Sequence, residues 1–218
     1  MSGRLIVIEG LDGSGKSTQL ELLSKRLDGN FRFVKFPDYP SESSALVRMY
    51  LEGEFGSHPE DVNAYAASSF YAVDRYASFK RDWGADYLGG TDILCDRYTT
   101  SNAVHQASKL SGDERDRFLD WLCDFEFGKL GIPRPDAVIF LDMPVEVSQR
   151  LMTGRYSGDE GRKDIHERDI AYLQHCREGA LYAAKRLGWS VVKCTDGDRV
   201  RSREDISDEI FSIISKIM

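Results

Sequence analysis

Residues 5–18 read LIVIEGLDGSGKST, an apolar run followed by a glycine-rich stretch. The run at 5–8 is rich in β-branched residues, which predicts a strand, and leucines at 20, 22, 23 and 27 predict a helix directly after the glycines. Residues 10–17 fit the pattern GxxxxGK[ST] in the strand–loop–helix context that a phosphate-binding loop requires. Glycines let backbone N–H groups approach phosphate oxygens, and the helix adds its positive amino end. The segment therefore predicts a nucleoside triphosphate site.

Two side chains of this loop carry its expected chemistry. Lys16 is expected to reach the β and γ phosphates of ATP, and the Ser17 hydroxyl is expected to hold Mg²⁺. The expected ATP-binding residues are Gly10, Leu11, Asp12, Gly13, Ser14, Gly15, Lys16, Ser17 and Thr18. A glycine-rich turn with an incidental lysine is the alternative, and the predicted strand and helix on either side argue against it.

The rest of the chain repeats the alternation of strand and helix patterns. Strand-like stretches lie at 31–36, 93–95, 137–141 and 190–193, and helical patterns separate them, including a long one from 61 to about 81. These patterns predict an α/β fold in which a five-stranded parallel sheet carries helices on both faces. With 218 residues, of which 41% are hydrophobic, the chain is expected to form a single domain, 1–218.

The charge balance argues against several classes of partner. Thirty-six acidic and 29 basic residues give a net charge of −7, which disfavours general binding to nucleic acid or to an anionic membrane. The apolar run at 5–8 is too short for a signal peptide or a membrane span, and the 4 cysteines form no CxxC pair. We therefore expect a cytoplasmic protein with reduced cysteines, in which any phosphorylated ligand is held by a local basic site.

Two further pairs of residues indicate what accepts the phosphate. Asp96 ends an apolar stretch, where P-loop proteins commonly place a carboxylate near Mg²⁺, and Arg97 follows with a planar fork suited to phosphate. Turn formation by Asp96 and a surface salt bridge by Arg97 are the alternatives. Tyr71 and Arg75 share one face of the long helix, where a ring beside a guanidinium can stack on a base and donate to O4 of thymine or uracil, or to O6 of guanine. A surface cation–π pair, or a bond from Arg75 to Asp74 or Asp96, would explain the same spacing.

In order and spacing, these motifs resemble those of the thymidylate kinase family, in its bacterial type. The shared motifs are GLDGSGKST at 10–18, Phe36-Pro37, YAVDR at 71–75, DRY at 96–98, Ser101-Asn102 and DIHE at 164–167. The match covers nearly the whole chain. The resemblance implies a P-loop nucleoside monophosphate kinase fold with a short lid, and ATP- and Mg²⁺-dependent phosphorylation of dTMP to dTDP. It also implies a homodimer as the usual assembly.

The resemblance further implies roles for residues around dTMP. Asp12 corresponds to the loop carboxylate that meets the sugar 3′-hydroxyl, and Arg97 to the clamp on the monophosphate. Tyr71 corresponds to the ring stacked on thymine, and Arg75 to the donor to O4. Asp96, together with the loop Ser17, corresponds to the Mg²⁺ ligands.

The remaining dTMP contacts rest on the same resemblance. Phe36 corresponds to an apolar contact with the base or sugar, and Ser101 and Asn102 to polar contacts near the base. Glu167 corresponds to the carboxylate that closes over the sugar with the lid. Tyr39 stands where many members carry an arginine that grips the monophosphate, and it is expected to bond near that phosphate or near the Asp12 region.

The catalytic charge is expected to come partly from the lid, about residues 150–163. Some family members carry an arginine inside the P-loop, where this chain has Gly13, and others place that charge in the lid. We hypothesise that Arg155, assisted by Arg162 or Lys163, supplies it here. The expected catalytic residues are thus Lys16, Asp12, Asp96, Arg97 and Arg155. No general base is needed, because a phosphate monoester is largely dianionic at neutral pH.

One further departure from the family pattern, an additional candidate for the monophosphate clamp, and two alternative functions remain to be named. His105 stands where the family often has a tyrosine beside the sugar, and Arg48 is a possible additional clamp on the monophosphate. Another nucleoside monophosphate kinase, with guanylate as acceptor, is the nearest rival, because O6 would also satisfy Arg75. A nucleotide-dependent switch with little turnover is the second rival.

Overall fold

A computed structural model describes residues 1–27, 31–155 and 170–217, with only the backbone described at 153–155. Its centre is a parallel sheet of five strands in the order β2-β3-β1-β4-β5. The strands are β1 (Leu5–Gly10), β2 (Phe31–Lys35), β3 (Asp92–Asp96), β4 (Ala137–Asp142) and β5 (Ser190–Lys193), followed by a short antiparallel pair, β6 (Thr195–Asp196) and β7 (Arg199–Val200). The predicted strands and their parallel arrangement are confirmed.

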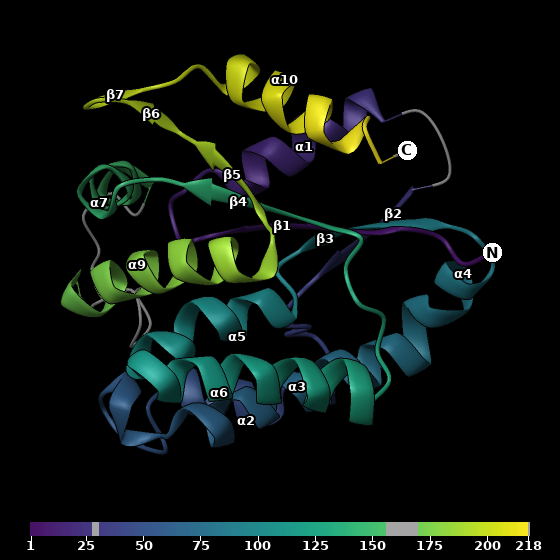
Figure 1. Ribbon diagram of the computed structural model, residues 1–218, viewed down its shortest axis with the longest axis vertical. Helices are drawn as coiled ribbons and strands as arrows, with labels where there is room; N and C mark the ends of the chain where they lie inside the picture. The colour runs from purple at the N-terminus through teal and green to yellow at the C-terminus, as the bar shows by residue number, and fades with distance from the viewer. Residues whose placement is uncertain (28–30, 156–169, 218) are drawn as a thin grey trace.

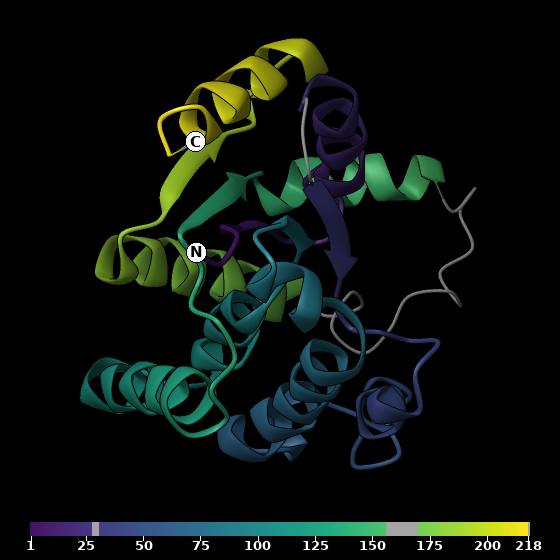
Figure 2. The ribbon, with the colours of Figure 1, turned by 90° about the vertical axis from the view of Figure 1, so that its right-hand side faces the viewer.

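Helices cover both faces of this sheet, as predicted. In Figure 1, α1 and α10 lie above the sheet, α5 and α9 lie below it, and α2, α3 and α6 form a further layer. Figure 2 shows the same separation from the side. The helices are α1 (Lys16–Arg26), α2 (Ala45–Leu51), α3 (Ala64–Ser78), α4 (Gly84–Leu88), α5 (Thr99–His105), α6 (Gly112–Cys123), α7 (Val145–Arg155), α9 (Ile170–Leu187) and α10 (Arg203–Ile214).

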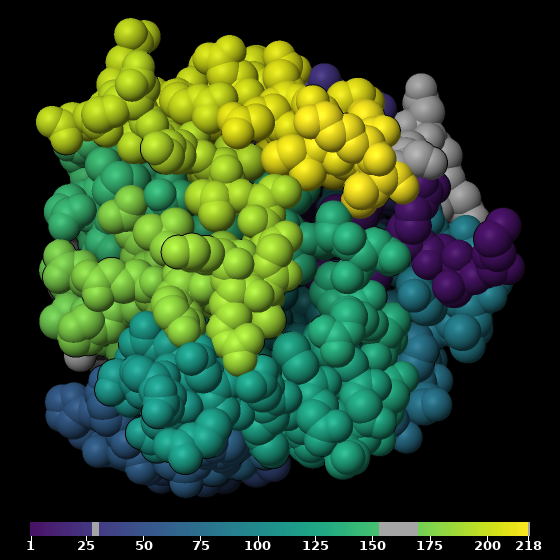
Figure 3. All heavy atoms as spheres, viewed as in Figure 1, coloured from purple at the N-terminus to yellow at the C-terminus, as the bar shows by residue number. Residues whose placement is uncertain are grey.

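The central strand β1 is apolar at successive positions because both of its faces are buried. Ile6 and Ile8 pack in one cluster with side chains of α1 and α10, among them Leu23 and Ile210. Leu5 and Val7 belong to a second cluster on the opposite face. In the space-filling view, the yellow-green and yellow atoms of the last part of the chain, which includes the edge strand β5, lie in front of the central strands (Figure 3). A strand enclosed in this way shows no alternation of polar and apolar residues.

The long helix differs from its predicted bounds of 61 to about 81. It begins at Ala64, because a 3₁₀ turn, Pro59–Asp61, precedes it and Asn63 caps it by accepting a hydrogen bond from the Ala66 N–H at 2.9 Å. At its other end it continues without a break through a π-helical turn, Phe79–Trp83, into α4. Helical spacing alone does not reveal either change.

The strand register brings the predicted motifs to one edge of the sheet. Asp96 at the end of β3 is level with Ile8 of β1 and with Lys35 of β2, while Gly10 is level with Leu141 of β4. Ligands of open parallel sheets bind beyond the carboxyl ends of the strands, and the P-loop leaves β1 at this edge. Within the described ranges, no helix is long and apolar enough to cross a membrane.

Candidate active site

The P-loop backbone leaves an open approach to the start of α1. Gly15, the residue before the helix, has a φ of +93°, and a Cβ atom built there would meet no atom of the described residues within 4 Å. The N-cap residue Gly15 has no side chain to cap the first N–H groups of α1, and the first turn of this helix carries no acidic residue. Free N–H groups at a positive helix end favour an anion, so the loop has the geometry expected of a phosphate site.

Lys16 lies folded inside the loop. Its Nζ donates to the carbonyl oxygens of Gly10 at 2.8 Å and Leu11 at 3.1 Å, and it is 3.9 Å from Asp12 Oδ1. Burial and the positive charge of Arg97 lower the pKa of Lys16, while nearby carboxylates offset part of that effect. The ammonium therefore sits directly beneath the loop that is expected to hold the β and γ phosphates.

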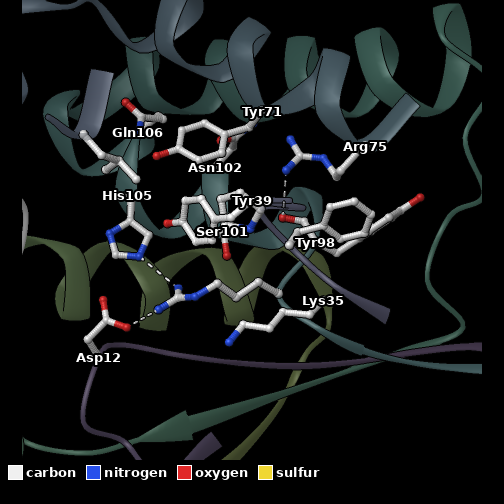
Figure 4. Close-up of a pocket in the computed structure, with 14 residues that line it drawn as sticks. Asp12, Lys35, Tyr39, Tyr71, Arg75, Tyr98, Ser101, Asn102, His105 and Gln106 are labelled. Atoms are coloured by element: carbon white, nitrogen blue, oxygen red, sulfur yellow. Dashed lines mark hydrogen bonds and ion pairs between the residues drawn. The ribbon is translucent and has the colours of Figure 1, made fainter. Parts of the chain in front are cut away.

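Arg97 links the loop to the space beside it. Its Nη2 donates to Asp12 Oδ1 at 2.5 Å, and its Nη1 lies 3.3 Å from His105 Nε2; both contacts are drawn as dashed lines in Figure 4. Its Nη1 also lies 3.4 Å from Glu9 Oε1. Its φ of +66° is uncommon for a residue with a Cβ, and such strained conformations cluster at functional sites. Burial opposes the charge on both partners, yet their mutual attraction outweighs it. The pKa of Asp12 is therefore well below its usual range and that of Arg97 is raised.

Glu9 is a site residue that the sequence analysis missed. It is fully buried, and its Oε1 accepts the Gly10 N–H at 2.9 Å in addition to facing Arg97. Its Oε2 accepts the hydroxyls of Thr100 and Ser101, each at 2.7 Å. One carboxylate thus connects the first residue of the P-loop with the first turn of α5. A carboxylate ending an otherwise apolar strand, directly before the loop glycine, was the available signal.

A pocket of about 340 Å³ opens beside Arg97, within the size range typical of small-molecule sites. It brings together eight of the nine residues expected to bind dTMP, from the P-loop, the segment after β2, α3, the segment after β3, and α5. These are Asp12, Phe36, Tyr39, Tyr71, Arg75, Arg97, Ser101 and Asn102. The ninth, Glu167, lies outside the described residues. So do Arg162, Lys163 and most of the expected lid, as does the side chain of Arg155.

The aromatic side of the pocket is supported by further rings. Tyr71 lines the pocket and stands edge-on to Tyr50, with ring centroids 6.4 Å apart. Phe36 is 98% buried and packs 5.9 Å from the ring of Tyr98. Packing behind these rings fixes their planes, as a stacking surface for a base requires.

Arg75 is buried, and neither of the partners suggested from its spacing binds it. Its Nε and Nη2 donate to the two carboxylate oxygens of Glu126, each at 2.6 Å, and its Nη1 donates to the Tyr98 carbonyl at 3.3 Å. These bonds use three of its five N–H groups, and Arg75 still lines the pocket. Asp74 instead accepts from the Asp38 N–H and the Ser43 hydroxyl.

Gln106 is a second functional candidate that no sequence motif indicated. It is 99% buried and lines the pocket, and neither its amide nitrogen nor its amide oxygen has a hydrogen-bond partner among the described residues. It follows Asn102 by four positions, so the two share one side of the chain at the end of α5. Buried amides normally have partners, so Gln106 is a candidate contact for a polar ligand.

Other pocket residues bear on the departures noted in the sequence. His105 lines the pocket and contacts Arg97, and because a guanidinium only donates, His105 Nε2 is the acceptor. Arg48 does not line the pocket; its Nη1 donates to the carbonyls of Tyr39 and Ser41 at 2.8 and 3.1 Å. Lys35, Pro37, Leu51 and Tyr98 complete the lining.

Oxygen donors for a metal lie beside the P-loop. Asp96 is 93% buried, and its Oδ1 has no hydrogen-bond partner within the described part of the chain, while its Oδ2 is 3.8 Å from Lys35 Nζ. The described residues contain no cluster of three or more His, Cys, Asp or Glu side chains that could hold a metal. Mg²⁺ is commonly held by one or two protein oxygens together with substrate phosphates, and Asp96 and Ser17 fit that arrangement.

Comparison with known proteins gives a consistent result. The family model described as thymidylate kinase matches residues 8–204. A thymidylate kinase of Mycobacterium tuberculosis is 36% identical over 191 residues, which cover 85% of this chain and 87% of the relative. A probable thymidylate kinase of Pyrococcus horikoshii is 32% identical over 216 residues, covering 98% and 97%. The solved structure of thymidylate kinase from Candida albicans superposes with a TM-score of 0.72 at 23% identity, covering 99% of this chain and 92% of that one.

Proposed function

The chain belongs to the thymidylate kinase family and transfers a phosphoryl group from ATP to dTMP, and we propose how its own residues share that work. The observation that carries the proposal is the Asp12–Arg97 pair, which joins the P-loop to the acceptor pocket. In this arrangement the terminal phosphate of ATP, held by Lys16, meets the phosphate of dTMP in front of Arg97. ATP and dTMP are then bound from opposite sides of one guanidinium.

The reaction requires neutralisation of charge more than proton transfer. The dTMP phosphate is already a nucleophile, so the residues must hold two anions in line and balance the charge on the group in transit. Lys16 and Arg97 supply fixed positive charge, and burial strengthens their interaction with phosphate. Asp12 and Glu9 hold the guanidinium in position while the site is formed.

The pocket walls suit a pyrimidine. Tyr71 provides a face for stacking, and the free N–H groups of Arg75 provide donors for O4. Asn102 donates through its Nδ2 to Ser68 O and Glu126 Oε1, so its Oδ1 is left as an acceptor for the N3–H of thymine. Gln106, with both amide atoms unpartnered among the described residues, adds a further polar contact to the ligand.

Mg²⁺ belongs to the proposed site through Ser17 and Asp96. Both offer oxygen, the ligand type that this ion prefers, and the Oδ1 atom of Asp96 lacks a partner in the described part of the protein. When bound, the ion neutralises negative charge on the ATP phosphates.

The transition-state charge that some relatives hold in the P-loop is assigned to Arg155. Gly13 supports this assignment, because its φ is +77° and a Cβ there would lie 2.9 Å from both Ser148 O and Met152 Cγ of α7. A side chain at position 13 would therefore displace α7. Arg155 ends that same helix, and Glu167 is assigned to the closing lid, though neither side chain is among those described.

The proposed assembly is a homodimer of single-domain chains in the cytoplasm. The exposed face of α3 supports the dimer: Tyr65, Val73 and Tyr76 are 37%, 51% and 38% exposed, so burial within one chain does not account for them. Tyr65 also packs against Trp121 of α6, with ring centroids 4.7 Å apart, which extends the apolar surface. A second copy of the same face is the occupant proposed for it.

A panel of monophosphates tests the proposed base reading. ADP release is measured with dTMP, dUMP, dCMP, dGMP and GMP at equal concentration, with ATP saturating. Turnover should be fastest with dTMP. Comparable or faster turnover of dGMP or GMP would favour the guanylate reading of Arg75. Background ADP release with every monophosphate, despite tight ATP binding, would favour a switch.

A further inference from the structure

Glu126 is a buried carboxylate that contacts two of the proposed base-reading side chains without lining the pocket. It lies in the π-helical turn Asp124–Lys129 after α6 and is fully buried. Its Oε1 accepts from Arg75 Nη2 at 2.6 Å and from Asn102 Nδ2 at 3.3 Å. Its Oε2 accepts from Arg75 Nε at 2.6 Å and from the Thr99 hydroxyl at 2.8 Å. All four contacts are donors, and the two carboxylate oxygens supply the acceptors that meet them.

These contacts fix the orientation of the Asn102 amide. Its Nδ2 faces Glu126 Oε1 and the Ser68 carbonyl at 3.2 Å, and both of those atoms only accept hydrogen bonds. In the opposite orientation, Asn102 Oδ1 would face Glu126 Oε1 and the Ser68 carbonyl. All three oxygens are acceptors, so neither of the two hydrogen bonds could form. The amide oxygen is therefore held on the side away from Glu126.

The same carboxylate fixes the guanidinium of Arg75. A bidentate pair holds the guanidinium plane at two points and leaves its remaining N–H groups in a fixed direction. Glu126 thus sets a donor, from Arg75, beside an acceptor, from Asn102. Thymine and uracil present the matching acceptor O4 and donor N3–H, whereas cytosine presents a donor at N4 and an acceptor at N3.

We propose that Glu126 is the positioning residue that sets the choice between thymine and cytosine, because it locks the donor Arg75 and the acceptor Asn102 in one arrangement. The inference rests on the proposed roles of Arg75 and Asn102 in reading the base. Glu126 itself does not touch the ligand. Its effect is specific to the edge of the base that carries position 4 and N3.

Replacement of Glu126 by glutamine tests this arrangement. Glutamine keeps the shape but turns one oxygen into an NH₂ donor. Because Arg75 donates to both oxygens, one of its two bonds is lost whichever way the new amide faces. Where the NH₂ replaces Oε1, it meets Asn102 Nδ2 and favours the opposite amide orientation. The variant therefore weakens the match to thymine and relieves the mismatch with cytosine.

The full-length Glu126→Gln enzyme is assayed for kcat and KM with dTMP, dUMP, dCMP and ATP. We expect the ratio of kcat/KM for dTMP over dCMP to fall by about tenfold or more, which is within the range for one base-edge pair. The dTMP to dUMP ratio and the KM for ATP should stay unchanged, because uracil shares the same edge. Asp124→Asn is the matched control: it lies two residues earlier, is exposed and pairs only with Lys129 among the residues described, and its ratios should equal the wild-type values.

One further variant shows which part of the proposal fails. Asn102→Ala tests the reading itself: if it lowers the dTMP to dCMP ratio while Glu126→Gln does not, the proposed reading stands and the role of Glu126 is wrong. If neither variant changes the ratio, both are wrong. An equal fall in kcat/KM for every monophosphate and for ATP would show a purely structural role for Glu126 and overturn the proposal.

Glu126→Gln leaves the buried guanidinium of Arg75 without a counter-charge, which can prevent folding. A double variant avoids this. Arg75→Gln with Glu126→Gln removes both charges together, so no charge is left buried and unpaired. Its dTMP to dCMP ratio should approach one. Because this variant also removes the donor Arg75, retention of the wild-type ratio would overturn the reading of the base by Arg75, and with it the proposal for Glu126.

Discussion

Arg97→Lys is the substitution that most directly tests how the two substrates meet. Both residues carry a positive charge and a Cβ, so the cost of the +66° φ is the same in each. What changes is the head group. A guanidinium can hold Asp12 with one nitrogen while the other faces Glu9, His105 and the pocket, whereas an ammonium offers a single nitrogen. We expect kcat/KM for dTMP to fall and the KM for ATP to stay close to wild type.

The magnitude follows from the contacts. Lysine that keeps the bond to Asp12 cannot also grip the dTMP phosphate with a second arm, so at least one charge-assisted hydrogen bond is lost. Such a bond contributes about 1.5–3 kcal/mol. At about 1.4 kcal/mol per factor of ten, kcat/KM for dTMP should fall by roughly 10- to 150-fold.

The assay is coupled ADP release with dTMP titrated at saturating ATP. Arg4→Lys is the matched control, because Arg4 also pairs with a carboxylate, Asp92 at 2.7 Å, but at the opposite edge of the sheet from the P-loop. It should leave kcat/KM for dTMP unchanged. A loss of less than about threefold in Arg97→Lys would refute the assignment of Arg97 as the clamp. A rise of the same size in the KM for ATP would also refute it.

Three further predictions concern the base, the pH dependence and the assembly. Tyr71→Ala should raise the KM for dTMP about 5- to 150-fold, as expected for loss of a stacked base, while Tyr76→Ala on the exposed face of α3 should not; equal effects would contradict the stacking role. Burial lowers the pKa of Lys109 to about 8, so the unfolded chain binds more protons above that pH and the free energy of unfolding should rise with pH. Urea unfolding at about pH 7.5 and about pH 9.5 should show this rise in the wild type but not in Lys109→Met, and the same slope in both would contradict it. Val73→Arg should convert the proposed dimer into a monomer in light scattering without loss of fold, and an unchanged mass would contradict the proposed interface.

The P-loop and the acceptor motifs were predictable because their signals are local. GLDGSGKST defines a loop by spacing alone, and Asp96 and Arg97 follow an apolar strand directly, so the parallel register brings them beside it. Every described residue that was assigned to dTMP binding lines the pocket. Local motifs are predictable in this way because one strand edge gathers them without any long-range choice of side-chain partners.

The polar partners of these residues were not predictable. Arg75 pairs with Glu126, 51 positions away, and nothing in the spacing of α3 indicates which carboxylate meets it. Glu9 was passed over because a strand pattern directs attention to its apolar members. Gln106 has no motif of its own, and only its burial without partners among the described residues reveals it. Such contacts depend on how separate elements pack, which a single sequence does not encode locally.

An experimental structure with dTMP bound would test the central claim most directly, namely that the P-loop and the pocket face each other across Arg97. The account predicts that phosphate oxygens of dTMP lie within hydrogen-bond distance of the Arg97 guanidinium, with the base against Tyr71 and its O4 toward Arg75. A dTMP phosphate bound away from Arg97, or a base outside this pocket, would contradict it.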